Sequence, residues 1–467
     1  MMKFLKIRTV VAIVLLLMVL CTTDSVVAQG VSKIFSEIRE INDSGITYTQ
    51  KIVAVGDSAT ISFSQSSSTT QYVFYYTDVN LPNNVNVAEL PQQYEVKDMV
   101  ILEDRIYFCG QTANANGFIA RAKINDLFFS SSFDVDIINN AKSIDKIEVY
   151  LRPRDNAVQI VTIGTDANKA QPFFLHSDEA IGWHYDFYYP NNSSETFDDL
   201  ELNEEYVLSI GTYFDGAQTA IIVRRYEKNN IPNFIQRTYP LLPASYYSPL
   251  NKFHAKTIQS GYLAIVGTVI YNDPQLPTTT RAIMLVSDVN NSSMPLLQQQ
   301  YLEGSQSFDI MIRDLSYHDA DGTMLIVSSF PAYPNPNNTY DAVLTWDVSQ
   351  STLPTSVMKY YTAVGPVVNP LILLNGVVEY KPYLFAAIGV DNTSDNVNVW
   401  YANRQIFSNT YHCSKPLPET LYPMSMGNME YEPLEQTPDA DINWSADSAN
   451  NYVLPAPIVC SSNNQNQ

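Results

Sequence analysis

The sequence is poor in charged residues, and beyond its first 20 residues it has no long apolar run. Charged residues make up 16% of the 467 residues, whereas the chain holds 31 Tyr and 20 Phe. This composition is too apolar for a disordered chain and suits β-strands. No stretch after Leu20 reaches the ~18 to 20 apolar residues that cross a membrane as a helix, so we expect no membrane span.

Basic residues are scarce. Lys and Arg together number 27 against 48 Asp and Glu, which gives a net charge of −21. A surface of this sign repels phosphate, and it argues against nucleic acid and anionic lipid as partners.

Recognisable catalytic and metal-binding motifs are absent. The sequence has no Gly-x-Ser-x-Gly element and no Gly-x-x-x-x-Gly-Lys phosphate loop. Its five histidines lack the spacing of metal ligands; they are His176, His184, His254, His318 and His412. We therefore expect no metal and no cofactor, and we predict no catalytic residue.

The first 28 residues have the features of a secretory signal peptide. Three basic residues precede an apolar run over 10–20, and Ala28 ends a cleavage site before Gln29. This predicts an exported protein, secreted or periplasmic. A lipoprotein acylated at Cys21 is the less favoured alternative, because Leu20 is bulky where lipoprotein processing needs a small residue.

Three cysteines remain after the signal peptide. Cys109 lies in an apolar strand-like run, where a buried free thiol is the favoured interpretation. Cys413 and Cys460 bracket the C-terminal tail and, in an oxidising compartment, are candidates for a disulfide. Two unpaired thiols are the alternative.

One pattern returns seven times along the chain: an apolar strand, a second strand that closes on Gly or Ser, and a third that stops at a polar residue. A fourth run with an aromatic residue follows several copies, the last of them at 406–411. The closing small residues are Ser64, Gly110, Gly164, Gly211, Gly267, Ser328 and Gly389. The polar stops are Asp78, Asp126, Asp178, Glu227, Asp288, Asp347 and Asn403.

Repeated units of four antiparallel strands are typical of a β-propeller. We therefore predict an all-β chain that forms a propeller of seven four-stranded antiparallel blades over 46–411, with six or eight blades as alternatives. A pair of β-sandwiches is the competing architecture, but it gives no reason for the recurring small residue. Between Trp183 and Tyr189, aromatic residues alternate onto one strand face, and we expect core packing there rather than a carbohydrate platform.

Two segments lie outside the repeats. In 29–45, apolar residues at helical spacing predict a short amphipathic helix; they are Val31, Ile34, Phe35, Ile38 and Ile41. The tail over 412–467 is polar and rich in Pro, and we expect it to be partly disordered and to wrap the ring.

A resemblance to known proteins rests mainly on the second repeat. Tyr-Phe-Cys-Gly at 107–110, Gly-Phe-Ile at 117–119 and Asn-Asp-Leu-Phe-Phe at 125–129 resemble exported propeller-like proteins of gut Bacteroidetes. The resemblance implies export and a propeller fold, and it carries over no functional residue.

Three classes of function fit the sequence. Our first prediction is a secreted, non-catalytic binding propeller that recognises a glycan or a protein through one face. The alternatives are a carbohydrate-active enzyme, a glycoside hydrolase or lyase with paired carboxylates on the propeller face, and a structural envelope component. We expect a monomer, because closure of the ring leaves no long free strand edge.

The predicted binding face carries the loops that join the second and third strands of each repeat. Two of these loops, 268–280 and 329–340, are longer than a hairpin needs, and extra loop length is often functional. Tyr supplies a stacking plane, and Asn and Asp supply hydrogen bonds. The candidate ligand-binding residues are Tyr213, Asp215, Tyr271, Asp273, Tyr333 and Asn335. The alternative is that these are long solvated loops.

Overall fold

The computed structural model describes most of the repeat region and parts of the tail. The residues described are 36–41, 46–56, 59–66, 71–76, 84–169, 171–181, 184–190, 194–214, 219–241, 247–250, 252–258, 261–272, 274, 278–303, 311–318, 323–331, 339–347, 359–363, 372–391, 397–403, 414–415, 421–423, 435–436, 440–441, 445–455 and 458–461.

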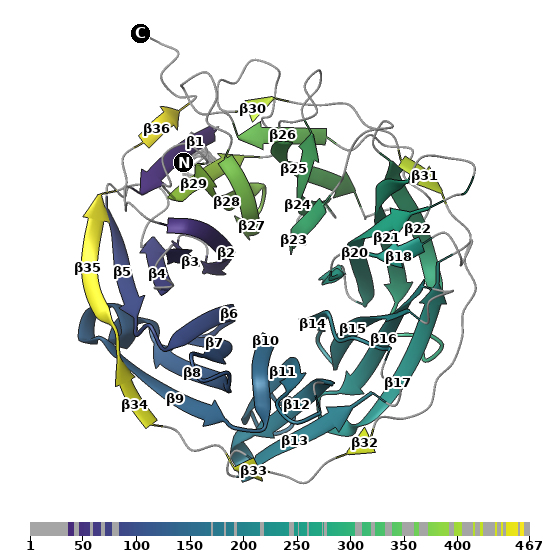
Figure 1. The fold of residues 1–467 in the computed structure, drawn as a ribbon, viewed down its shortest axis with the longest axis horizontal. Coiled ribbons are helices and arrows are strands. Elements are labelled where there is room, and N and C mark those ends of the chain that lie inside the picture. The colour runs from purple at the N-terminus through teal and green to yellow at the C-terminus, as the bar shows by residue number, and fades with distance from the viewer. Residues whose placement is uncertain are drawn as a thin grey trace, which may run out of the picture.

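The described strands form seven antiparallel sheets that follow one another around a ring, which is the β-propeller that the repeats predict (Figure 1). We number the sheets as blades 1 to 7 in chain order. Blade 1 holds β2 (Ile46–Val55), β3 (Ala59–Ser66), β4 (Gln71–Tyr76) and β5 (Asn84–Leu90). Blade 2 holds β6 (Tyr94–Leu102), β7 (Arg105–Thr112), β8 (Gly117–Lys123) and β9 (Ser132–Ile138). Blade 3 holds β10 (Ala141–Leu151), β11 (Val158–Asp166), β12 (Pro172–Asp178) and β13 (His184–Tyr189).

The other four blades repeat this plan. Blade 4 holds β14 (Asp199–Leu202), β15 (Tyr206–Phe214), β16 (Thr219–Glu227) and β17 (Asn230–Pro240). In blade 5, β18 (Tyr247–Pro249) and β19 (His254–Ile258) both pair with β20 (Tyr262–Tyr271), followed by β21 (Thr279–Asp288) and β22 (Leu296–Glu303). Blade 6 holds β23 (Met311–His318), β24 (Thr323–Pro331), β25 (Thr339–Asp347) and β26 (Lys359–Ala363). Blade 7 holds β27 (Ile372–Lys381), β28 (Leu384–Asp391), β29 (Val397–Asn403) and β1 (Ser36–Ile41).

The hydrophobic core lies between neighbouring blades, because each small sheet can bury its faces only against the next sheet. One cluster joins Tyr107 and Cys109 of blade 2 to Ile147 and Phe173 of blade 3. The thiol of Cys109 is buried and free, as predicted. The aromatic run of β13 belongs to the same cluster, with Tyr185, Phe187 and Tyr189 at most 4% exposed, which confirms core packing.

The recurring small residues have a steric cause. In blades 1, 2, 3, 6 and 7 the first strand contains a β-bulge, and the small residue of the second strand pairs with the residue where the bulge begins. A Cβ added at Gly110 would lie 1.8 Å from the carbonyl oxygen of Glu95, and one at Gly164 would lie 2.2 Å from that of Ser143. The small residue therefore leaves room for the backbone of the bulged strand.

The N-terminal segment differs from the predicted helix. Residues 36–41 form β1, which pairs with β29 and completes blade 7. An isolated helix of this length is marginal in water, whereas the free edge of β29 offers six residues a complete ladder of partners. From the sequence we expected 406–411 to form the fourth strand at this edge of the last blade. Those residues lie outside the described part of the chain, as do Val31, Ile34 and Phe35 of the predicted helix.

The C-terminal tail adds short strands to the outer edges of the blades, drawn in yellow at the rim of Figure 1. They are β30 (Ser414–Lys415), β31 (Leu421–Pro423), β32 (Glu435–Gln436), β33 (Ala440–Asp441), β34 (Ser445–Ser448), β35 (Asn450–Pro455) and β36 (Ile458–Ser461). They pair in turn with blades 6, 5, 3, 2, 1 and 7, so the tail runs around the ring against the order of the blades. Cys460 lies in β36, and Cys413 falls outside the described residues.

Helical structure in the described part consists of a turn over Asp126–Ser130, preceded by helical residues 124–125, and a turn over Glu179–Ile181. Within the same residues, no helix is long and apolar enough to cross a membrane.

Candidate functional site

In Figure 1, β2, β6, β10, β14, β23 and β27 lie nearest the centre of the ring, and each begins its blade. In blade 5 the corresponding strand is β19, which pairs with β20. One position recurs on these innermost strands. In each blade it pairs with the residue of the second strand that comes directly before the closing small residue. We call the residues at this position the axial ring: Lys51, Asp98, Lys146, Asp199, His254, Asp314 and Gly376. In five blades it directly follows the bulge, and a bulge re-aims the side chains beside it.

Charges of opposite sign alternate along the first part of the axial ring. Lys51 Nζ lies 2.6 Å from Asp98 Oδ1 in the next blade, and Lys146 Nζ lies 3.2 Å from Asp199 Oδ1. Burial and the neighbouring Lys146 lower the pKa of His254 to about 4, so its ring is neutral at pH 7. The axial ring therefore holds ion pairs between blades 1 and 2 and between blades 3 and 4.

The aspartates of the axial ring also bind the backbone of the following blade. The backbone N–H of Ile147 donates to Asp98 Oδ2 at 3.0 Å. The N–H of Ala255 donates to Asp199 Oδ2 at 2.8 Å, and that of Val377 donates to Asp314 Oδ2 at 2.9 Å. Blades 2, 4 and 6 are thus each hydrogen-bonded to the next blade through an aspartate carboxylate, which is a structural role for these charges.

The groups of the axial ring also influence one another across the centre. Burial acts to lower the pKa of Lys146, but Asp199, Asp98 and Asp314 outweigh it and raise that pKa. Asp314 belongs to blade 6, on the far side of the ring from Lys146 in blade 3. Burial raises the pKa of Asp314 to about 6.

A second group of charges lies two residues further along three innermost strands. We call Glu148, Glu201 and Lys256, from blades 3, 4 and 5, the axial triad. Lys256 Nζ lies 3.0 Å from Glu201 Oε2. The corresponding positions in blades 1, 2 and 7 are apolar, Val53, Val100 and Val378, so the triad makes one side of the axis polar.

The pKa values of the two carboxyl groups of the triad are both raised. Burial, followed by the charge of Glu201, raises the pKa of Glu148 to about 8. Burial also raises the pKa of Glu201, although Lys256 opposes this shift. A group that titrates near neutral pH can accept or donate a proton, so the triad has the chemistry of an acid–base site as well as that of a polar binding site.

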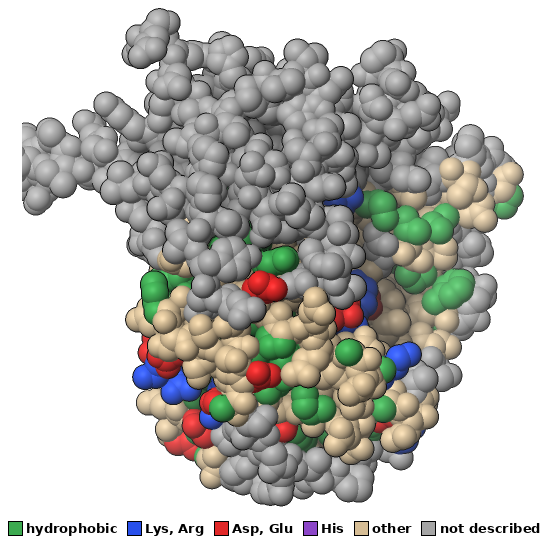
Figure 2. Space-filling view, turned by 60° about the vertical axis from the view of Figure 1, so that its left-hand side comes forward, with side chains coloured by type: hydrophobic (Ala, Val, Ile, Leu, Met, Phe, Trp, Pro, Cys, Tyr) green, Lys and Arg blue, Asp and Glu red, His purple; other side chains and the backbone are tan. Residues whose placement is uncertain are grey.

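Further cations lie at the start of the innermost strands. Lys97 Nζ is 2.8 Å from Asp145 Oδ1, and Lys252 Nζ is 3.6 Å from Asp145 Oδ2. Arg313 donates to the side chain of Asn375 in blade 7. On the side of the molecule seen in Figure 2, the described acidic and basic side chains are interspersed with polar and apolar ones. Described charges therefore lie on that outer surface as well as near the axis.

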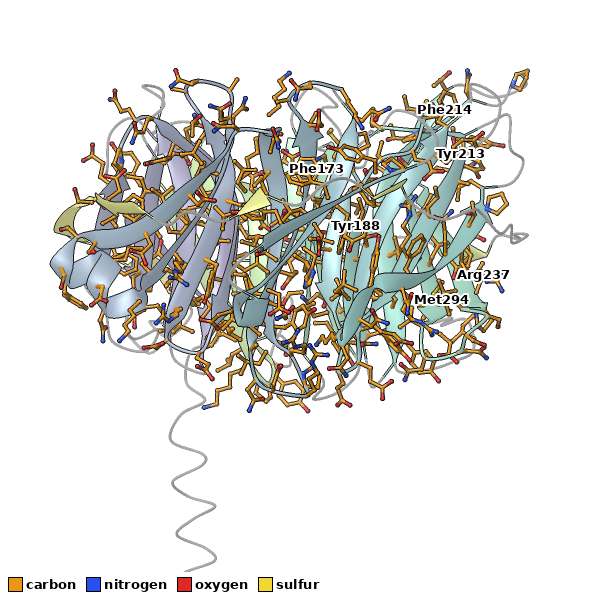
Figure 3. The ribbon with its side chains drawn as sticks, turned by 90° about the horizontal axis from the view of Figure 1, so that it is seen from below. Phe173, Tyr188, Tyr213, Phe214, Arg237 and Met294 are labelled. Carbon is orange, nitrogen blue, oxygen red and sulfur yellow. The ribbon has the colours of Figure 1, made fainter. Side chains whose placement is uncertain are left out.

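The structure describes two of the six ligand-binding residues predicted from the sequence. Tyr213 is half-buried near the end of β15, and Figure 3 shows it at one rim of the ring beside Phe214, which is 39% exposed. Tyr271 is 8% exposed, with its ring 5.1 Å from that of Tyr247 and the Arg281 guanidinium 3.4 Å from its centroid. It is therefore packed rather than free to stack on a ligand. The other four lie outside the described residues: Asp215, Asp273, Tyr333 and Asn335.

We did not predict the axial ring and triad from the sequence, although their charged residues follow a recurring pattern. The first strands carry charged residues directly before an apolar residue, as in Lys97-Asp98-Met99, Asp145-Lys146-Ile147 and Arg313-Asp314-Leu315. Alignment of the repeats on their small residues brings these charges into one register.

Comparison with models of protein families finds no match, and comparison with curated proteins finds none either. Among solved structures, the chain is similar to the Dos1 propeller, with a TM-score of 0.40, 9% identity, and 75% of this chain and 77% of that chain covered. It is similar to a polysaccharide lyase of family PL25, an ulvan lyase (TM-score 0.41, 9% identity, 78% and 96% covered). It is also similar to the phage phi92 endosialidase (TM-score 0.41, 9% identity, 79% and 69% covered). At these values the similarities carry no argument about function.

Proposed function

We propose that this protein is an exported binding propeller that recognises a glycan or a protein through one face, with the axial triad as part of the contact. The observation that supports this proposal is the placement of charged, partly exposed lysines on two innermost strands, Lys146 on β10 and Lys256 on β19, whereas Glu201 of β14 is buried. Lys256 has 36% of its side chain exposed and Lys146 has 21%. Charged groups cost free energy when they lose water, and the ion pair of Lys256 with Glu201 offsets part of this cost.

The rim that carries Tyr213 and Phe214 is the second part of the proposed contact. These side chains end β15, next to one of the loops that join second and third strands. Because Glu201 pairs with Leu208 and Tyr213 lies opposite Glu195, this rim and the triad lie toward opposite ends of the blade, and we propose the rim as a separate contact. Its aromatic side chains offer the stacking planes that a sugar or a peptide requires. Asp215, Asp273, Tyr333 and Asn335 remain proposed ligand-binding residues.

Export and a monomeric state belong to the same proposal. Residues 1–28 supply the signal for export in the sequence, and a protein that binds glycans or proteins outside the cytoplasm needs such a signal. The ring form supports a monomer, because each blade buries its faces against neighbours in the same chain.

Binding is tested on an array of neutral and acidic oligosaccharides that includes fragments of xylan, pectin, alginate and chondroitin sulfate. We expect wild-type protein to bind at least one of them. Lys256→Gln should weaken that binding by about tenfold, whereas Asp134→Asn, which changes an exposed carboxylate on β9, should leave it unchanged. Binding that Lys256→Gln does not alter would place the site away from the axis. An absence of binding to all of these oligosaccharides and to surface proteins would favour a structural envelope component.

A carbohydrate-active enzyme, hydrolase or lyase, is the second candidate function. The observation that favours it is the adjacency of two carboxyl groups from neighbouring blades, Glu148 and Glu201, one of which holds a proton at neutral pH. Incubation with the same oligosaccharides separates the two candidates, because a binding protein leaves them intact.

A further inference from the structure

In the ion pairs beside the axis, the lysine is the more exposed partner. We call the lysines of these pairs the axial lysines: Lys51, Lys97, Lys146, Lys252 and Lys256. The side chain of Lys51 is 24% exposed, whereas that of its partner Asp98 is 3% exposed. The side chain of Lys256 is 36% exposed against 8% for Glu201, and the other three pairs have the same order. A ligand that approaches the axis therefore meets ammonium groups before carboxylates.

The buried position of the carboxylates has a structural cause. Asp98 and Asp199 accept hydrogen bonds from backbone N–H groups of the following blade, which hold the negative charge against the protein. On the outer strands β8 and β9 the pair of Arg121 and Asp134 has the reverse order, with 18% and 45% of the side chains exposed. Exposure of the cation is thus a feature of the pairs at the axis and not of every ion pair in the described residues.

Positive charge is in excess near the start of the innermost strands. Asp145 alone is bound by two ammonium groups, that of Lys97 at 2.8 Å and that of Lys252 at 3.6 Å. One carboxylate cannot neutralise both. Lys252 and Lys256 are four residues apart, so at ~3.3 Å per extended residue the axial lysines extend over up to ~13 Å, which is longer than one sugar ring.

The net charge of −21 does not cancel this local excess. At physiological ionic strength, charges separated by more than ~8 Å through solvent are largely screened, so a ligand at the axis responds mainly to the lysines beside it. A nucleic acid is still disfavoured, because a long polymer with one charge per ~1.7 Å of helix would also meet the acidic surroundings.

We propose that the axis binds an acidic glycan, whose sugars carry carboxylates or sulfates, an inference that rests on the proposed glycan binding. The axial lysines bind the anionic groups of this glycan. The half-buried Glu148 and the carboxyl oxygens beside the lysines bind its hydroxyl groups, which can donate or accept hydrogen bonds. Sugar rings are rigid, so such a glycan loses less conformational freedom on binding than an acidic peptide does.

The test compares two forms of the same pectin oligosaccharide, one with free carboxylates and one in which they are methyl esters. The two ligands differ in charge but not in the sugar chain. We expect the free acid to bind wild-type protein at least about tenfold more tightly than the ester, measured by calorimetry at pH 7. Salt at about 0.5 M should weaken binding of the free acid by at least about tenfold, because it screens the lysines.

Variants locate the contact. Lys97→Gln combined with Lys252→Gln should weaken binding of the free acid at least about tenfold, whereas Lys97→Arg combined with Lys252→Arg keeps the charge and should stay within a few fold of wild type. The control is Lys123→Gln, at an exposed lysine that ends β8, which should not change the affinity. Equal melting temperatures check that the variants are folded.

The outcomes separate this inference from the proposed function. Equal affinity for the free acid and the ester, or binding of xylan alone, overturns the acidic class and leaves glycan binding in place. An affinity that the double Gln variant does not lower overturns the role of the lysines. Binding of poly-glutamate as tight as that of the free acid overturns the glycan in favour of an acidic peptide. An absence of binding to every one of these glycans overturns glycan binding, and this inference with it.

Discussion

At the scale of single residues, the closing small residue of the second strand leaves room for the bulged first strand in the five blades that contain this bulge. Gly110 lies beneath the carbonyl of Glu95, whereas Ser64 holds the same place in blade 1 with a side chain that fits. These positions were visible in the sequence because each unit repeats them. The charges of the axial ring were not recognised, because their proximity depends on bulges and on strands some 50 residues apart.

Gly110→Ala should destabilise the protein, because its Cβ would lie 1.8 Å from a backbone oxygen that cannot move without loss of strand pairing. We expect a loss of about 1 to 3 kcal/mol in the free energy of unfolding, measured by urea denaturation. Ser64→Ala is the matched control. The buried Ser64 hydroxyl has no hydrogen-bond partner in the described structure, so its removal should be neutral or stabilising. Equal losses in both variants would contradict the steric explanation.

Glu148 should make stability depend on pH. Its pKa is raised from 4.5 to about 8, so the folded state binds this proton more tightly than the unfolded chain does. Stability from this group is therefore present below pH 4.5 and is lost as the pH rises to about 8. Between pH 5 and pH 8, wild-type protein should lose at least about 1 kcal/mol more than Glu148→Gln in urea titrations. Parallel losses would show that Glu148 does not hold the proton.

At the scale of elements, the strands at the two chain ends were the hardest to foresee. The apolar residues Ile38 and Ile41 suit either a helix or a strand, and the choice is made by β29, whose sequence lies some 360 residues away. The short C-terminal strands have almost no pattern of their own. They form because the outer edges of the blades offer unpaired backbone groups.

A specific side-chain contact accompanies the pairing of β34 with blade 2. The hydroxyl of Tyr94 donates to Asp447 Oδ2 at 2.7 Å, and the backbone of Ala449 donates to Ser131. Tyr94→Phe should weaken this attachment by about 1 to 3 kcal/mol, because the hydrogen bond is to a charged group. Limited proteolysis should then cut the tail faster than in wild-type protein. Tyr262→Phe, a change at an exposed tyrosine, is the control and should leave the rate unchanged.

At the scale of the whole molecule, the all-β propeller follows from the repeats, because each blade carries its own pattern. Five of the predicted polar stops are the last residues of third strands: Asp178, Glu227, Asp288, Asp347 and Asn403. The binding face was harder to predict, because loop length and aromatic content do not show which side chains pack, as Tyr271 illustrates.

The tail that encircles the ring is the segment in which the proposed disulfide would lie. We expect Cys413 and Cys460 to be bonded and Cys109 to remain a free, buried thiol. Labelling of the mature protein after denaturation without a reductant should mark one cysteine, and labelling of the native protein should mark none. Three labelled cysteines after denaturation would contradict the disulfide.

The central claim is that the charged axis beside blades 3 to 5 is the place where a ligand binds. A crystal structure of the protein with an oligosaccharide that it binds on the array tests this claim most directly. We predict electron density for the sugar against the innermost strands β10, β14 and β19, within hydrogen-bond distance of Lys256 or Glu148. Density only at the outer edges of the blades, with an empty axis, would contradict it.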